Sequence, residues 1–111
     1  MKITPNYVEL VARDLDATRR FYEVAFGFAL TPYGPGYAAV EGGPVELGFR
    51  RSDEALAPLP TFETDDLEAS LAAAERAGAT IVAPIFSYPG GRRFELLDPT
   101  GNRLAVYQKG G

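Results

Sequence analysis

The sequence contains no histidine and no cysteine. Without histidine the chain cannot build Ser-His-Asp or Cys-His catalytic groups, and it has no imidazole to bind a metal. Without cysteine it has neither a disulfide framework nor thiolate chemistry. These two absences exclude many enzyme classes, and together with the lack of a signal-like N-terminus they predict a cytoplasmic protein.

Long apolar runs and clustered positive charge are also missing. No apolar stretch approaches the roughly 18 residues of a membrane span, so we expect no membrane. The net charge is −4, and the Arg-Arg pairs are far apart in the sequence. Nucleic-acid binding favours clustered Lys and Arg, so we expect no nucleic-acid partner. A chain of 111 residues with 46% hydrophobic residues is predicted to fold as one domain, spanning 1–111.

The first half of the chain predicts one strand, one helix and three further strands. Asp14 is a candidate N-cap and Gly27 suits the end of the helix. The spacing of Phe21, Tyr22 and Phe26 predicts that they form the buried face of this helix. The expected strands lie at 7–12, 28–32, 37–41 and 45–51, with Gly/Pro turns between the last three.

The second half repeats this order after a Pro-rich linker at about 52–60. A short strand at 61–64 precedes a helix capped by Asp65 or Asp66 and ended by Gly78. Expected strands follow at 80–88, 93–97 and 103–108. The last two flank the turn 98–102, Asp-Pro-Thr-Gly-Asn, which predicts a closing β-hairpin.

Two matches between the halves indicate an internal duplication. Asp-Leu-Asp-Ala-Thr at 14–18 matches Asp-Leu-Glu-Ala-Ser at 66–70, and Phe-Gly-Phe at 26–28 matches Ala-Gly-Ala at 77–79. The matches are almost in register and lie within the same order of elements. We therefore expect a first module at about 1–51 and a second at about 61–111.

These motifs, together with Tyr-Val-Glu-Leu-Val at 7–11 and Arg-Phe-Tyr-Glu at 20–23, resemble the vicinal oxygen chelate superfamily of glyoxalases, bleomycin-resistance proteins and dioxygenases. The resemblance covers nearly the whole chain. It implies an α+β fold of two tandem βαβββ modules whose curved mixed sheets enclose a cleft. It is closest in character to the metal-free, drug-binding branch of bleomycin-resistance proteins.

The resemblance also locates four metal-ligand positions of the family's enzymes. They fall at Tyr7, Glu46, near Leu59 and at Ala105, so one carboxylate remains. One carboxylate beside a phenol and two apolar side chains is a poor ligand set for Zn²⁺, Fe²⁺ or Mn²⁺. We therefore expect no metal, no other cofactor and no catalytic residue.

Alternation along the strands then predicts that Tyr7, Glu9, Glu46 and Tyr107 line the cleft. Tyr37, Phe86 and Tyr88 lie at strand ends or next to Gly/Pro turns, where we expect an aromatic rim over it. Each of them has an ordinary structural alternative: Glu9 could pair with an arginine such as Arg93, and each aromatic residue could pack in the core or at a strand edge. The candidate ligand-binding residues are Tyr7, Glu9, Glu46, Tyr107, Tyr37, Phe86 and Tyr88.

Three hypotheses for function follow from this acidic, partly aromatic cleft. The first is a protein that binds and sequesters a small molecule such as an antibiotic, expected to be aromatic and allowed to be cationic. The second is a metal-independent lyase or isomerase that uses Glu46 or Glu9 as general base. The third is an accessory module with a vestigial cleft.

The resemblance further implies a homodimer. Either each subunit forms the cleft from its own two modules, or the subunits exchange modules through the linker. The sequence leaves both arrangements open.

Overall fold

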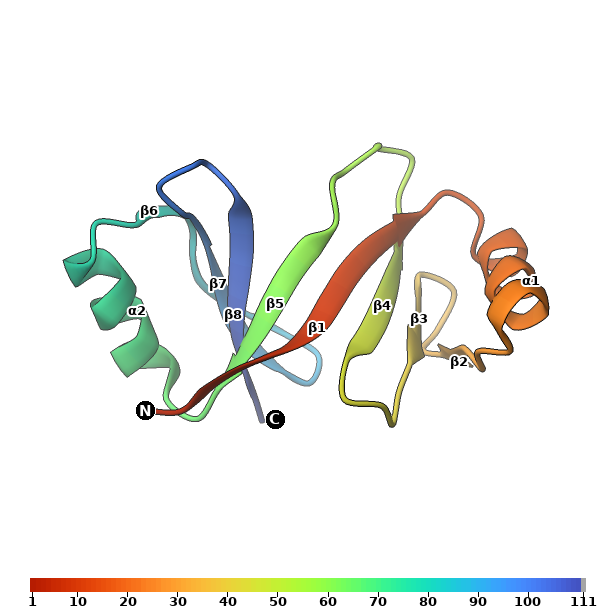
Figure 1. Ribbon diagram of the computed structural model, residues 1–111, viewed down its shortest axis with the longest axis horizontal. Helices are drawn as coiled ribbons and strands as arrows, with labels where there is room; N and C mark the ends of the chain where they lie inside the picture. Colours follow the sequence, from red (N-terminus) through yellow and green to blue (C-terminus); the bar gives the residue numbers. More distant parts are fainter. Residues whose placement is uncertain (111) are drawn as a thin grey trace. The chain divides into compact units, whose positions relative to one another are not determined.

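A computed structural model describes residues 1–110; Gly111, the last residue of the expected second module, lies outside the described residues. The chain has an α+β fold in which the order strand, helix, three strands occurs twice (Figure 1). The elements are β1 (Ile3–Ala12), α1 (Leu15–Phe26), β2 (Thr31–Pro32), β3 (Tyr37–Val40), β4 (Glu46–Arg51), β5 (Leu59–Thr64), α2 (Leu67–Arg76), β6 (Thr80–Tyr88), β7 (Gly91–Leu97) and β8 (Arg103–Lys109). The expected α+β fold of two βαβββ modules is confirmed.

The chain divides into two structural units. One comprises Tyr7–Pro58, and the other comprises Met1–Asn6 together with the described residues from Leu59 onward. The strand β1 therefore contributes to both. Its first residues belong to the second unit, where the Lys2 amide donates to Asp65 Oδ1 (2.8 Å) and Asn6 Nδ2 donates to Glu63 Oε1 (2.9 Å).

In the unit Tyr7–Pro58 the strand order is β2-β3-β4-β1. The strands β1 and β4 are parallel, and the other two pairs are antiparallel. One face of this sheet packs against α1, where Ala12, Leu30, Ala38 and Phe49 form the buried core beside Leu15 and Tyr22. The opposite face carries Tyr7 and Glu9 of β1, Tyr37 of β3, and Glu46 and Arg50 of β4.

The other unit repeats this plan with the strand order β5-β8-β7-β6. The strands β5 and β8 are parallel, while β7 pairs antiparallel with both β8 and β6. Its core packs beneath α2 and consists of Leu67, Phe94, Leu96 and Val106.

The two helices begin in the same way, which supports the duplication read from the sequence. Asp14 accepts a hydrogen bond from the Ala17 amide, and Asp66 accepts one from the Ala69 amide, both at 3.0 Å. These carboxylates satisfy amides that would otherwise have no partner in the first turn. α1 ends at Gly27, whose φ of 71° is in the left-handed region.

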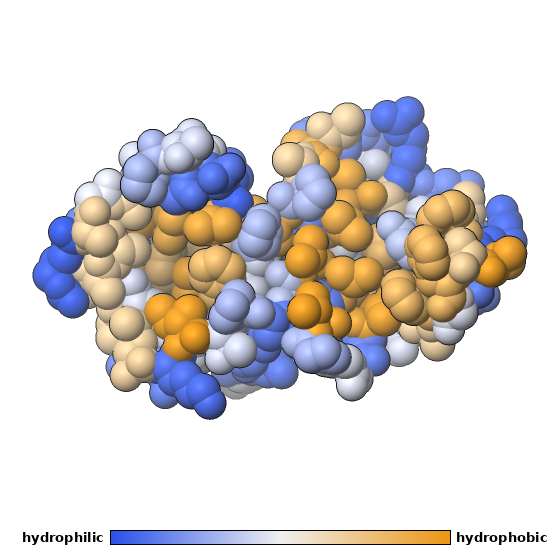
Figure 2. Space-filling view, in the orientation of Figure 1, coloured by the Kyte–Doolittle hydropathy of each residue, from blue (hydrophilic) through white to orange (hydrophobic). Residues whose placement is uncertain are grey.

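The burial of α1 differs from the expectation. Phe21 and Phe26 are 57% and 61% exposed, so the prediction that they belong to the helix-face core is wrong, whereas Tyr22 is half-buried and packs against the core. The reason is that α1 carries apolar residues on two faces, and the sheet covers one of them. Figure 2 shows apolar residues gathered over α1, at the right of the view.

No helix in the described part of the chain is long and apolar enough to cross a membrane.

The expected closing hairpin is present, with β7 and β8 antiparallel from Leu97↔Arg103 onward. Its turn is organised by Asp98. Its carboxylate accepts hydrogen bonds from the Thr100 amide (3.0 Å), the Asn102 amide (2.8 Å) and the Asn102 side chain (2.9 Å). These bonds favour the ionised form and lower the pKa of Asp98, with the Asn102 side chain as the largest cause.

We predict that Asp98→Ala lowers the melting temperature at pH 7, because the turn loses all three hydrogen bonds to the Asp98 carboxylate. Asp98→Asn retains one acceptor oxygen, so its melting temperature should lie between those of the wild type and Asp98→Ala. Because the folded-state pKa is lowered, the stabilisation is complete above the unfolded value of about 3.9 and is lost as pH falls through the folded value. Thermal unfolding from pH 2 to 7 measures this. A difference between wild type and Asp98→Ala that persists unchanged at pH 2 would contradict it.

Candidate functional site

The sheet face that lies opposite α1 gathers four of the sequence-predicted site residues. Register partners on neighbouring strands point to the same face of a sheet. Tyr7 lies opposite Glu46 and Glu9 lies opposite Gly48 across β1 and β4. Tyr37 lies on the same face, opposite Arg50 across β3 and β4. The structure therefore brings Tyr7, Glu9, Tyr37 and Glu46 together on one surface.

The centre of this surface is a pair of tyrosines. The hydroxyl groups of Tyr7 and Tyr37 form a hydrogen bond over Gly48. A Cβ atom at position 48 would collide with both hydroxyl oxygens, so glycine is needed there for the two side chains to meet. The pair depends on a residue that contributes no side chain of its own.

Burial sets the protonation of Tyr7. It raises the pKa of the Tyr7 phenol far above its ordinary value, and the hydrogen bond to Tyr37 and the carboxylates of Glu9 and Glu46 act in the same direction. A phenolate would be poorly solvated there and repelled by both carboxylates. Tyr7 is therefore a neutral phenol at physiological pH, able to donate a hydrogen bond but unsuited to act as a base.

Two carboxylates and one guanidinium surround the tyrosines. The side chain of Glu9 is only 12% exposed, and its Oε1 lies 3.7 Å from Nε of Arg50. Glu46 Oε2 accepts a hydrogen bond from the Gly42 amide at 3.3 Å. With Arg50 balancing one of the two carboxylates, this aromatic surface keeps negative charge.

The other unit has a comparable surface on the sheet face opposite α2. Tyr107 lies opposite Glu63 and Arg93, and Arg93 lies opposite Phe86. Tyr107 Oη donates to Asn6 Oδ1 at 3.1 Å. Tyr88 follows at the end of β6. The structure therefore groups the remaining predicted residues, Phe86, Tyr88 and Tyr107, on this second surface.

An arginine is the centre of this second surface. The Arg93 guanidinium carbon lies 5.3 Å from the centre of the Phe86 ring and 5.8 Å from that of Tyr88, within cation–π range. Arg93 Nη2 and Arg103 Nη2 approach the buried carboxylate of Glu95 at 2.9 and 2.7 Å. On this surface two guanidinium groups approach one carboxylate, so it carries positive charge, in contrast to the acidic Tyr7–Tyr37 surface.

Sequence reasoning placed neither arginine in the site. It named Arg93 only as an example of an arginine that could pair with Glu9, whereas the structure has Arg50 within ion-pair distance of Glu9 and Arg93 beside Glu95. Arg50 follows Glu46 and Gly48 at alternate positions on β4, and Arg93 precedes Glu95 in the same way on β7. The two-residue period of a strand was therefore sufficient to place Arg50 beside the predicted residues. The contact of Arg93 with Phe86 depends on the pairing of β6 with β7, which has irregular register between Ile81 and Phe86.

The family's metal-ligand positions can be compared with what stands there. Tyr7 and Glu46 are register partners. In the other unit the expected position near Leu59 is at the start of β5, and Ala105 lies opposite Thr61 of the same strand. The first pair offers one carboxylate and a neutral phenol, and the second offers no charged ligand. Within residues 1–110, no three acidic side chains are grouped so that they could hold a metal ion. The residues present do not fit the metal centre of the family's enzymes.

Solved structures share this fold along nearly the whole chain. NAD-dependent benzaldehyde dehydrogenase from Legionella pneumophila is 18% identical, with a TM-score of 0.80 over 96% of this chain and 100% of that one. A superfamily member from Vibrio splendidus 12B01 is 16% identical, with a TM-score of 0.71 over 97% of each chain. Methylmalonyl-CoA epimerase from Mycobacterium tuberculosis is 14% identical, with a TM-score of 0.73 over 96% of this chain and 87% of that one.

No protein with a curated description matches this sequence. The family model "Glyoxalase/Bleomycin resistance protein/Dioxygenase superfamily" matches residues 4–106. Since that match spans almost the entire chain, the protein belongs to the glyoxalase/bleomycin resistance protein/dioxygenase superfamily.

Proposed function

We propose that this protein binds a small aromatic molecule, with cations favoured, and sequesters it without chemical change, as a drug-binding resistance protein would. The observation that carries the proposal is the Tyr7–Tyr37 pair over Gly48, flanked by the carboxylates of Glu9 and Glu46. Two aromatic side chains offer a stacking surface for a planar ring, and the carboxylates attract a positive charge. Antibiotics with planar, positively charged groups have this chemistry.

The protonation and charge pairing of these residues support binding rather than turnover. Tyr7 stays protonated, and Glu9 lies within ion-pair distance of Arg50. A general base needs a carboxylate that is available to the substrate proton. Tyr7 has no carboxylate, and that of Glu9 lies within ion-pair distance of Arg50.

Glu46 supports a second candidate function, a metal-independent lyase or isomerase. Within the described residues, its carboxylate accepts one hydrogen bond, from the Gly42 amide at 3.3 Å. Glu46 also lies opposite Tyr7 across β1 and β4. Glu46 as general base and Tyr7 as hydrogen-bond donor could together move a proton at a carbon next to a carbonyl group. The substitution below distinguishes this function from sequestration.

We predict that Glu46→Gln weakens binding of a planar aromatic cation, for example ethidium followed by fluorescence, by about tenfold, because one charge contact is lost. Glu54→Gln makes the same charge change at an exposed loop position of the same unit and should leave the affinity unchanged. Recovery of unaltered ligand by mass spectrometry is expected for sequestration. Turnover that Glu46→Gln abolishes while binding persists would replace this proposal with the enzyme.

Gly48→Ala tests whether the tyrosine pair is the binding surface. The added Cβ must displace the two hydroxyl groups, which are the far ends of side chains, so we expect the fold to persist. The melting temperature should fall modestly, and the affinity for the aromatic cation should drop at least as far as in Glu46→Gln. Circular dichroism and the same fluorescence titration measure both effects. Unchanged affinity in a folded Gly48→Ala protein would remove the pair from the site.

The raised pKa of Tyr7 predicts a specific loss of stability in alkali. The neutral phenol stabilises the fold fully below the unfolded pKa of about 10, and this contribution is lost as pH rises toward the folded value. Urea unfolding between pH 8 and 11 should therefore show a steeper decline for wild type than for Tyr7→Phe, which has no proton to lose. Parallel declines would show that Tyr7 ionises normally.

We further propose that the protein is a homodimer that uses the outer face of α1. Ala17, Phe21 and Val24 form an exposed stripe at positions i, i+4 and i+7, and Val24 is 88% exposed. Two antiparallel copies of α1, related by a two-fold axis between positions 20 and 21, would place Ala17 against Val24 of the partner subunit. Arg20 would then cover the ring of Phe21 of the partner subunit. The stripe is thus complementary to itself in size, with the small Ala17 against the larger Val24 of the partner subunit.

We predict that Val24→Glu converts a dimer into a monomer in light scattering after size-exclusion chromatography, because it buries charge at the contact. Leu56→Glu, at an exposed apolar residue of the same unit outside the stripe, should leave the dimer intact. A Val24→Glu protein that remains dimeric would exclude this face and leave a contact through exchanged modules as the alternative.

A further inference from the structure

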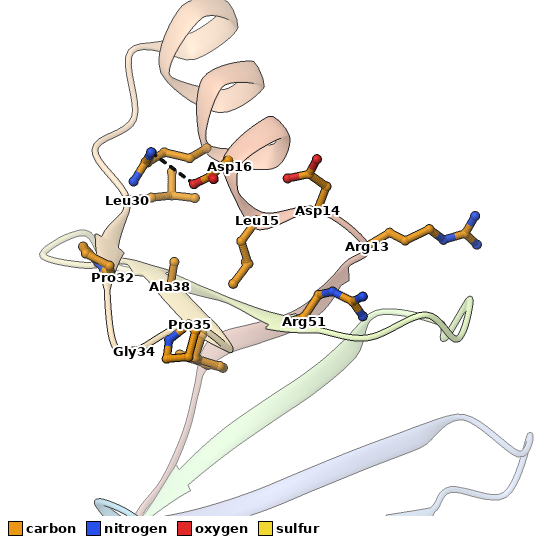
Figure 3. A pocket seen from close by; sticks show the side chains of 12 residues that line it. Arg13, Asp14, Leu15, Asp16, Leu30, Pro32, Gly34, Pro35, Ala38 and Arg51 are labelled. Carbon is orange, nitrogen blue, oxygen red and sulfur yellow. Dashed lines mark hydrogen bonds and ion pairs between the residues drawn. The ribbon is translucent and has the colours of Figure 1, made fainter.

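A cavity of about 480 Å³ lies in the unit Tyr7–Pro58 between the start of α1 and the turn that joins β2 to β3 (Figure 3). This volume is within the usual range for small-ligand pockets. The cavity adjoins the side of the sheet that faces α1. Ala38, which lines it, belongs to the core beneath α1, whereas its neighbour Ala39 lies opposite Gly48 on the Tyr7–Tyr37 surface. Tyr37 also lines the cavity, so the cavity meets the Tyr7–Tyr37 surface at that residue, while Leu15, Leu30 and Ala38 lie on the side of the sheet that faces α1.

The floor of the cavity is apolar and fixed. Leu15, Leu30 and Ala38 contribute aliphatic side chains from α1, from the segment before β2 and from β3, and Leu30 and Ala38 are buried. The turn wall is anchored at both ends, because the Arg51 amide donates to the Gly36 carbonyl (2.9 Å) and the Tyr33 amide donates to the Tyr37 carbonyl (2.8 Å). An apolar group entering here would meet a preformed wall, which limits the entropy cost of binding.

The acidic residues at the rim are already engaged. Asp14 accepts from the Ala17 amide at 3.0 Å as the helix cap. Asp16 accepts from Arg19 Nη2 at 3.3 Å. Ionised carboxylates only accept hydrogen bonds, so these two groups offer a ligand little beyond their remaining lone pairs.

The arginines at the rim keep donors available. Arg51 uses Nη2 for Asp53 at 3.0 Å, which leaves most of its five N–H groups unused in that ion pair. Arg13 makes no ion pair or side-chain hydrogen bond with the residues that the structure describes. Both arginines stand at the ends of the neighbouring parallel strands β1 and β4, since Ala12 pairs with Arg51, and Figure 3 shows them on the same side of the cavity.

We propose that this cavity binds a small organic carboxylate, with its apolar body on the Leu15, Leu30 and Ala38 floor and its carboxylate on Arg51 and Arg13. The planar guanidinium matches a carboxylate through two parallel hydrogen bonds, so a carboxylate fits this rim better than a neutral polar group. The ligand class is thus opposite in charge to the one proposed for the Tyr7–Tyr37 surface. One chain would hold an anion on one side of a sheet and an aromatic cation on the other.

The test is a ¹³C-methyl NMR titration of the whole chain with 3-phenylpropanoate. We expect the methyl signals of Leu15, Leu30 and Ala38 to shift while that of Ala39 stays in place. Arg51→Gln should weaken binding by about tenfold, the effect of one charge-assisted hydrogen bond. Arg13→Gln should weaken it in the same direction. Arg76→Gln makes the same change at an exposed arginine in the last turn of α2, outside the cavity lining, and should have no effect.

Two further ligands separate the alternatives. Equal binding of the neutral 3-phenylpropanamide would show an apolar pocket without carboxylate selectivity and would overturn the proposal. Inorganic phosphate that binds as well as the carboxylate, without moving the Ala38 methyl signal, would reduce the site to a surface anion patch. A shift of Ala39 alone, or no shift at concentrations on the order of 10 mM, would also overturn it. None of these outcomes measures aromatic-cation binding at the Tyr7–Tyr37 surface, which the ethidium titration reports separately, so failure of one proposal is distinguishable from failure of the other although Tyr37 borders both sites.

Discussion

The alternation of side chains across the strands is the constraint on which the rest of this structure depends. In each unit a helix covers one sheet face, and the residues between the covered positions must point the other way. On β1 this rule sends Val8 and Leu10 toward α1 and Tyr7 and Glu9 away from it. A shift of register by one residue would exchange the core and the binding surface, so core packing and site geometry are specified together.

A residue without a side chain makes the first binding surface possible. Gly48 lies between Glu9 on β1 and Ala39 on β3, and its missing Cβ leaves the space in which the Tyr7 and Tyr37 hydroxyls meet. Burial of the pair then keeps Tyr7 protonated. A single glycine in a central strand therefore sets both the shape and the proton content of this surface.

The two units share a plan and differ in electrostatics. Equivalent sheet faces carry Tyr7 and Tyr37 with the carboxylates of Glu9 and Glu46 in one unit, and an arginine within cation–π range of two aromatic rings in the other. The helices differ as well, since α2 buries Leu67 and Ser70 whereas α1 buries no residue. Duplication preserved the backbone pattern, because backbone pairing depends little on side-chain identity, while the exposed faces diverged in charge.

The sequence by itself determined the α+β fold, the duplicated order of elements, the Asp14 cap, a second cap at Asp65 or Asp66, and the closing hairpin around Asp98, and the structure selects Asp66. These features depend on local hydrogen bonds, turn chemistry and periodicity, which neighbouring residues fix. It also identified Tyr7, Glu9, Glu46 and Tyr37 as candidate ligand-binding residues. Only the tertiary structure decided that Tyr7 bonds to Tyr37 and that Phe21 and Phe26 stay exposed. The cavity beside α1 was also decided by the tertiary structure. All three features depend on which strands pair and on which face of α1 the sheet covers, and residues distant in the sequence decide the strand pairing and the helix packing.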